Sequence, residues 1–314
     1  MLSRIAENVY WLGRYVERAD DTVRLVATHY YGLLQIGTSD GDVFPAELLA
    51  VLGHPPSADP TPSLRAAVTR CVTDPDNQLS VASCLRAARE NARRSREVLS
   101  LELWETLSAA TRWLDTSGSH AGADELLREA PQWTHAFYGL VDQTMRRGPA
   151  WRALRLGMLL ERADMTVRVL ILAADTLTTE DEDKGGPKPD DPLGAHLWTT
   201  ALRACSALDA FWATSPGLPT ARSVARVLLR DEDCPRSLVY CLREAGRLLD
   251  GASEPARQAE ALAGQIASAG PAPLVEGGGQ LRRLLAGCQA LDAAIAAHWL
   301  EQPAAGQLAA RGAS

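Results

Sequence analysis

In the 314-residue sequence we expect neither a secretion signal nor a membrane-spanning segment. Charged residues begin at Arg4, so the N-terminus has no apolar core of the length that a secretion signal needs. No run approaches about 18 uncharged apolar residues. Acidic residues outnumber basic ones, 39 against 32, which argues against a nucleic-acid binder or a protein held on anionic lipid. We expect a cytoplasmic protein that contacts neither nucleic acid nor a membrane.

The motifs of several common chemistries are also missing. No glycine-rich phosphate loop follows a predicted strand, and no serine or cysteine stands in a nucleophile elbow. The six histidines never form the ExxH or HxxxH pairs that di-iron and zinc sites use. The six cysteines lie far apart, without a CxxC. The sequence therefore predicts no metal, no cofactor, and reduced thiols that are mostly buried.

Helix-forming residues are abundant instead, and the alternating runs of β-branched residues typical of strands are missing. From Ile5 to Leu33, apolar residues recur in alternating steps of four and three, which predicts one helix of about 33 residues, or roughly 50 Å. Ser3 is its expected N-cap, and Gly37 marks its end. The fold class is thus all-α, a bundle of long helices. Further helices are predicted at 45–52, 62–72, 78–114, 122–147, 149–177, 195–214, 219–229, 235–250, 253–269 and 280–300.

Two segments lack apolar anchors. Residues 178–194 are acidic and rich in proline and glycine, which predicts a mobile, solvated linker. Residues 303–314 predict a frayed tail. The remainder is interpreted as one helical domain over 1–314.

The chain contains an internal repeat. Leu12–Arg24 matches Leu156–Arg168 at nine of thirteen positions, at an offset of 144 residues. A second set of residues, which begins at Asp74, recurs from Asp231 at an offset of 157. The repeat predicts a pseudo-symmetric bundle formed by an internal duplication. Its halves span about 1–147 and 148–314.

Both copies place a glycine inside the predicted helix, Gly13 and Gly157. Glycine there costs about 1 kcal/mol relative to alanine, and close approach of another backbone or a bulky ring would compensate for it. Glu17 and Glu161 lie one turn further along nearly the same face. We therefore expect the two long helices to cross near their glycines and to bring both Glu-Arg pairs to a common centre.

Several motifs resemble one known family. The opening run from Ser3 to Ala19 reads SRIAENVYWLGRYVERA, and AREN followed by AR occupies 88–93. Trp104-Glu105 and Pro235-Arg236-Ser237 come later. Together these resemble the signature of the bacterial alpha-E domain family over essentially the whole chain. The resemblance implies an all-helical protein encoded beside, or fused to, a circularly permuted ATP-grasp ligase, often near a transglutaminase-like cysteine peptidase. It also implies ATP-dependent amide-bond formation on a peptide or small molecule.

The sequence departs from that signature at two positions. Met158 stands where a second arginine is expected after the glycine, so only the first half carries Gly-Arg-x-x-Glu-Arg. This departure argues against a symmetric two-site mechanism. Gln78 stands where a proline is expected, which matters less because Asn77 can still cap a helix.

A charged stripe accompanies the apolar one. Arg14, Glu17, Asp21 and Arg24 follow spacings of three, four and three, and Glu7 lies one heptad before Arg14. The stripe is either an exposed row of ion pairs, each contributing about 0.2–0.5 kcal/mol, or an inward polar network that binds a charged group. Such a network can also be purely structural. The candidate residues for binding a substrate or partner are Glu7, Arg14, Glu17, Arg18, Asp21, Arg24, Arg89, Glu90, Arg93, Glu161, Arg162, Arg168 and Arg236.

Two of these groups carry alternative interpretations. Arg89, Glu90 and Arg93 belong to a basic run, which is either a solvated helix face or a surface for an anionic partner. Arg236 stands near a helix start, where capping explains the pattern and an anion site is the alternative.

Three functions fit these residues. The first is a helical accessory module that works with an ATP-grasp ligase, non-catalytic alone or co-catalytic, and binds or presents a peptide or amino substrate through a central Glu/Arg network. The second is an aminoacyl or peptidyl transferase with Glu17 or Glu161 as general base, which requires a water-accessible glutamate with a raised pKa. The third is a purely structural scaffold.

Overall fold

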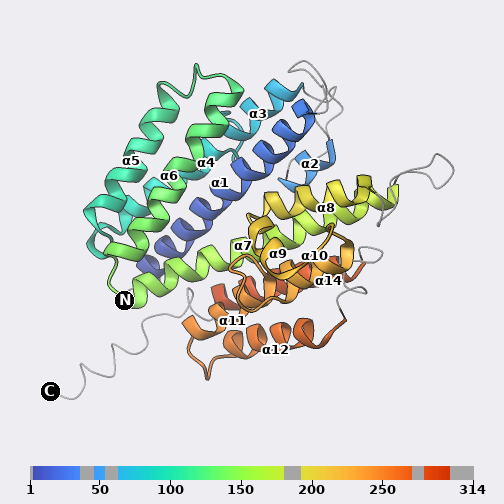
Figure 1. Cartoon of the computed structure of the whole chain (residues 1–314). Coiled ribbons are helices and arrows are strands. Elements are labelled where there is room, and N and C mark those ends of the chain that lie inside the picture. Colours follow the sequence, from blue (N-terminus) through green and yellow to red (C-terminus); the bar gives the residue numbers. More distant parts are fainter. Residues whose placement is uncertain (1–2, 36–45, 54–62, 180–191, 271–278, 298–314) are drawn as a thin grey trace.

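The computed structural model describes residues 3–35, 46–53, 63–179, 192–270 and 279–297. Over these ranges the chain forms helices and no β-strand, so the predicted all-α class is confirmed (Figure 1). None of the described helices is both long enough and apolar enough to cross a membrane.

Two long helices, α1 (Ser3–Gln35) and α7 (Pro149–Thr179), cross at the centre of the molecule and share its most extensive helix contact (Figure 1). Most of the helices that cover α1 on its other sides belong to the first half, and most of those that cover α7 belong to the second half, whereas α8 packs on both long helices. The first set is α3 (Leu64–Val72), α4 (Val81–Arg94), α5 (Leu101–Asp115) and α6 (Ala123–Thr144), of which α5 packs on α4 and α6. The second set is α8 (Pro192–Ala204), α11 (Leu238–Leu248), α12 (Glu254–Ser268) and α14 (Gly279–Ile295), of which α12 packs on α11 and α14.

The crossing lies at the two glycines, as predicted. A Cβ atom on Gly13 would lie 2.2 Å from the carbonyl oxygen of Leu154, and one on Gly157 would lie 2.1 Å from that of Tyr10. Any side chain would therefore collide with the backbone of the other helix. The two contacts are reciprocal, because Leu154 is offset from Tyr10 by the same 144 residues that separate the glycines. The duplication itself stays an interpretation of the sequence.

The prediction of a single helix at 78–114 is wrong. The structure divides it into α4, a 3₁₀ turn η1 (Arg96–Val98) and α5. Ser95 leaves the helical conformation with φ −127° and ψ 23°, and the Ser100 hydroxyl caps α5 by accepting a hydrogen bond from the Leu103 amide. Serine competes for backbone hydrogen bonds in this way at helix ends.

The predicted helix at 195–214 is divided as well, into α8 and α9 (Leu208–Thr214). Ser206 has a φ of 50°, in the left-handed region, and the Ala207 amide bonds back to Leu202. This is the geometry that ends a helix. The predicted helix at 219–229 is α10 (Ala221–Ala225), which continues as a π-helical turn, η3 (Arg226–Arg230). The remaining short helix is α2 (Ala46–Val51).

The second recurring set occupies equivalent positions in the two halves. Ser80 caps α4 and Ser237 caps α11, and each hydroxyl donates to the backbone carbonyl six residues earlier, in Asp74 and Asp231. Asn77 supports the turn before α4 but is not its N-cap.

The predicted linker and tail are mostly undescribed. The linker is narrower than predicted, because residues 178–179 belong to α7 and 192–194 to α8. Residues 180–191 and the predicted tail at 303–314 lie outside the described residues, as does the expected stop at Gly37.

Candidate functional site

The two Glu-Arg pairs exchange partners across the α1–α7 crossing. Arg18 donates from Nε and Nη2 to Glu161 at 2.6 and 2.9 Å. Arg162 donates from the same two atoms to Glu17 at 2.6 and 3.0 Å. Both contacts are bidentate, the strongest and most directional form of a guanidinium–carboxylate pair. Each long helix therefore carries the acid that binds the arginine of the other.

A second arginine binds each of the two glutamates. Arg14 donates to Glu161 at 2.5 Å, whereas Arg236, which lies just before α11, donates to Glu17 at 3.0 Å. Met158, the repeat counterpart of Arg14, needs no guanidinium because Arg236 supplies the second cation at Glu17. The departure from the signature is thus compensated by a residue from another part of the chain.

Two partners of Arg14 were not predicted. Arg14 Nη1 donates to Asp292, on α14, at 2.6 Å and to the Tyr10 hydroxyl at 3.2 Å. The Tyr10 hydroxyl in turn donates to Asp292. Burial raises the pKa of Tyr10 well above its usual range and outweighs the opposing charge of Arg14. The only sequence signal for Asp292 is a lone acid among the alanines and leucines of its helix.

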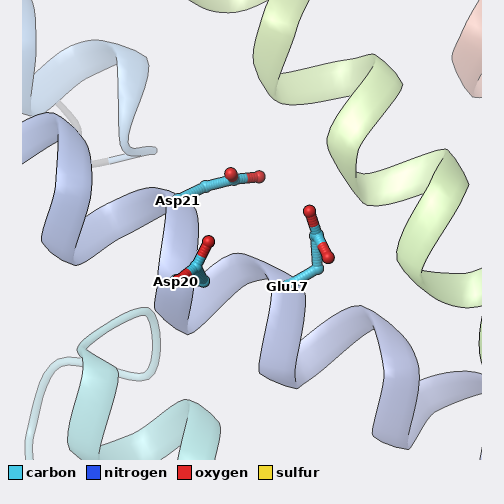
Figure 2. A group of neighbouring side chains, drawn as sticks. All are labelled: Glu17, Asp20 and Asp21. Carbon is cyan, nitrogen blue, oxygen red and sulfur yellow. The ribbon is translucent and has the colours of Figure 1, made fainter. Parts of the chain in front are cut away.

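Three carboxylates gather at the Glu17 end of the crossing. Figure 2 shows Glu17, Asp20 and Asp21 on consecutive turns of α1, with Glu17 and Asp21 on the side that faces α7. Asp20 accepts from Thr134 of α6 at 2.7 Å and from Arg24. Asp21 accepts from Arg24 at 3.0 Å and from Arg236 at 3.2 Å.

One oxygen from each of these carboxylates lies within 4.8 Å of the others, close enough to bind a metal ion together. Three guanidinium groups, of Arg24, Arg162 and Arg236, already pair with these acids. Because the acids are neutralised by cations of the same chain, the donor set does not favour a divalent cation.

The pKa values of Glu17 and Asp21 are shifted in opposite directions, by the balance between burial and neighbouring charges. At Glu17 burial raises the pKa, but Arg162 and Arg236 outweigh it and hold the pKa at about 2. At Asp21 burial dominates and raises the pKa to about 7. The like charges of Glu17 and Asp20 raise the pKa of Asp21 further, whereas Arg24 and Arg236 lower it. Its Oδ2 atom is buried without a hydrogen-bond partner among the described residues.

The geometry contradicts the condition set for a general base. The exposed fraction of Glu17 is 0% and that of Glu161 is 2%. Burial raises the pKa of Glu161, but Arg14 and Arg18 lower it below its usual value. A sealed carboxylate with a lowered pKa does not take up a proton near neutral pH. Neither glutamate therefore meets the condition of a water-accessible carboxylate with a raised pKa.

The remaining candidates lie outside the two glutamate clusters. Arg89 and Arg93 are exposed on α4, and Arg93 pairs with Glu90 at 2.8 Å. Both interpretations of this run, a solvated helix face and a surface for an anionic partner, stay predictions. Arg168 pairs with Asp164 at 2.5 Å, in the same i,i+4 relation as Arg24 and Asp20 in the first half. Glu7 is exposed near the start of α1.

Two hollows flank the crossing on the described surface. One of about 420 Å³ lies above Asp20 and Arg24 and is bordered by His135 of α6 and Arg203 of α8. The other, of about 690 Å³, lies between the N-terminal part of α1 and the end of α4. It contains Glu7 and Trp11.

These features define an all-α domain whose two central helices are joined by exchanged Glu-Arg pairs. The family described as "a predicted alpha-helical domain with a conserved ER motif", Alpha-E, matches residues 1–300. The chain belongs to the Alpha-E family. Glu17-Arg18 and Glu161-Arg162 are its two Glu-Arg sequences at the crossing.

Similar proteins do not reveal an activity. Uncharacterised proteins of Mycobacterium bovis and Mycobacterium tuberculosis are 25% identical over 323 aligned positions, which cover 91% of this chain and 35% of each relative. The chain thus spans about a third of the length of these curated relatives. No solved structure matches the chain.

Proposed function

We propose that the chain is a helical partner module of an ATP-grasp amide ligase, non-catalytic by itself, which presents a peptide or amino substrate to the ligase. The observation that carries the proposal is the closed state of the Glu/Arg network. Every carboxylate at the crossing is bound by arginines of the same chain, so these residues join α1 to α7 and are not free to react. Contacts with a ligand or a partner protein are then made by the outer surface of the domain.

The length of the relatives also supports a partner module. The relatives are almost three times as long as the aligned part, so the domain occurs there within a larger polypeptide. The named ligase and the nearby transglutaminase-like peptidase come from the family resemblance alone. The buried network also favours a second candidate, a purely structural scaffold, because an ion-pair lock at a helix crossing needs no ligand.

Reconstitution tests the proposal. The chain is combined with the ATP-grasp ligase encoded beside it, ATP and a panel of amino acids and peptides, and amide product and ADP are measured with and without the chain. A partner module increases product formation and co-elutes with the ligase. If the chain binds the ligase without changing product formation, the result supports the second candidate, a structural scaffold. If the chain neither binds the ligase nor increases product formation, the result contradicts the partnership.

Variants separate structure from chemistry in the same assay. Glu161→Gln removes a carboxylate from the network and is expected to lower product formation only in proportion to the folded fraction measured by circular dichroism. Arg128→Ala, in an exposed ion pair on α6, serves as the matched control. Loss of product by a fully folded Glu161→Gln protein would restore a chemical role for this glutamate.

A further inference from the structure

The hollow between α1 and α4 gathers polar side chains that the buried network does not use. We call it the α1–α4 groove. Its α1 side is formed by Arg4, Ile5, Glu7, Asn8, Trp11 and Tyr15, and its other side by Asn91, Arg94 and Glu97. The two helices lie side by side (Figure 1), although Asn91 is more than 70 residues from the α1 side along the chain. The groove is therefore formed by the fold rather than by one helix face.

Most polar groups of the groove are free. Arg4, Glu7, Glu97 and the amide side chains of Asn8 and Asn91 form no hydrogen bond or ion pair with any residue that the structure describes, whereas Arg94 pairs with Glu90 at 2.9 Å. In contrast, Arg14 and Glu17, further along α1, are each bound by two charged partners. Polar side chains without protein partners are available to a ligand.

The floor of the groove is held in place by the network. Trp11 packs beside Tyr15, with ring centroids 5.9 Å apart, and the Arg14 guanidinium lies 5.8 Å from the Trp11 ring. Arg14 is in turn fixed by Glu161 and Asp292. A ring supported in this way is a preorganised surface for an apolar or cationic side chain.

The chemistry of the groove selects the ligand class. The groove carries both signs of charge. Arg4 and Arg94 suit a carboxylate and Glu7 and Glu97 an ammonium group, whereas a polyanion would require one sign of charge. Each asparagine amide offers a donor and an acceptor, which complement the N–H and C=O of a peptide unit. The volume of about 690 Å³ falls within the ~300–1,000 Å³ range of ligand sites and exceeds what one amino acid needs.

We infer that the α1–α4 groove binds a short peptide with free ammonium and carboxylate ends and an apolar or cationic side chain over Trp11. The inference deepens the proposed function by naming the surface that holds the substrate. It does not depend on the ligase for its test, because binding is measured with this chain alone, whereas the partnership is measured by co-elution.

Fluorine NMR of the full chain labelled with 5-fluorotryptophan tests the inference. The Trp11 signal is assigned with Trp11→Phe and followed during titration with tripeptides that have free ends and leucine, phenylalanine or lysine in the middle. The same peptides with acetylated and amidated ends, and inorganic phosphate, are the comparison probes. We expect a saturable shift with at least one free-ended peptide, and at least about fivefold weaker binding of its blocked form.

Variants then locate the site. Asn8→Ala with Asn91→Ala, and separately Glu7→Gln, are expected to weaken the same peptide at least about fivefold, whereas Arg128→Ala binds it as the native chain does. Glu7 is exposed, so its variant stays folded and keeps the test valid if the double variant does not. The inference is overturned by no Trp11 shift up to about 10 mM peptide, by an equal response to phosphate, or by unchanged affinity in folded groove variants.

Discussion

Replacing Gly13 by alanine perturbs the α1–α7 crossing with the smallest possible side chain. The added Cβ would lie 2.2 Å from the Leu154 carbonyl oxygen and 3.2 Å from the Met158 nitrogen, both backbone atoms. Ordinary contact requires about 3.5 Å, so the helices must separate by roughly 1 Å or bend. The backbone cannot move aside as a flexible side chain could.

The magnitude follows from two costs and one gain in the free energy of unfolding. Overpacking in a core costs about 1–3 kcal/mol, and separating the helices also stretches the bidentate contacts of Arg18 with Glu161 and of Arg162 with Glu17, which are 2.6–3.0 Å long. Weakening charged hydrogen bonds costs about 1.5–3 kcal/mol more. Alanine recovers about 1 kcal/mol of helix propensity. The expected net loss is about 3 kcal/mol in the free energy of unfolding.

Urea unfolding followed by far-ultraviolet circular dichroism measures this loss. Gly32→Ala is the matched control, because Gly32 lies on the same helix and a Cβ there meets nothing within 4 Å. It is expected to gain up to about 1 kcal/mol. A Gly13→Ala protein as stable as Gly32→Ala would refute the reasoning. If Gly13→Ala does not fold while Gly32→Ala does, the result agrees with it.

Three further predictions concern the buried groups. Glu161→Gln leaves Arg14 and Arg18 without their shared counter-charge and is expected to lower the free energy of unfolding by about 3–5 kcal/mol; a loss below about 1 kcal/mol in urea unfolding contradicts a buried pair. Between its ordinary pKa of 3.8 and its folded value of about 7, Asp21 keeps a proton in the fold that it loses on unfolding. Its contribution to stability therefore falls by up to about 1.4 kcal/mol per pH unit as the pH rises through that window. Asp21→Asn should flatten this slope, and equal slopes in unfolding series from pH 4 to 7 would show that the site does not titrate. All six cysteines are free and buried, and burial raises their thiol pKa values, to about 12 at Cys84 and Cys241. A thiol reagent should label none of them before urea unfolds the chain, and rapid labelling in buffer would contradict their burial.

The helix crossing was predictable because its signals are local. A strict apolar period specifies α1, and a glycine that costs free energy inside a helix requires a close neighbour in return. The recurrence of that glycine with Glu-Arg four residues later then pointed to a shared centre. These features depend on spacing within one segment.

The partners of the network were not predictable in this way. Asp292 meets Arg14 from 278 residues away, and Arg236 reaches Glu17 from 219 residues away. The spacing of charges on a helix is the same for an exposed stripe and a buried one, so the seal around Glu17 depends on tertiary packing. The helix ends at Ser95 and Ser206 were also not predicted, because helix-forming residues continue on both sides of each serine.

A double-mutant cycle on Glu17 and Arg162 tests the central claim that exchanged Glu-Arg pairs join the two long helices. The free energies of unfolding of Glu17→Gln, Arg162→Met and the double variant are compared with that of the native chain. Because the two side chains form a bidentate pair at 2.6 and 3.0 Å with almost no solvent contact, the account predicts a favourable coupling of about 2–3 kcal/mol. A coupling near zero would contradict it.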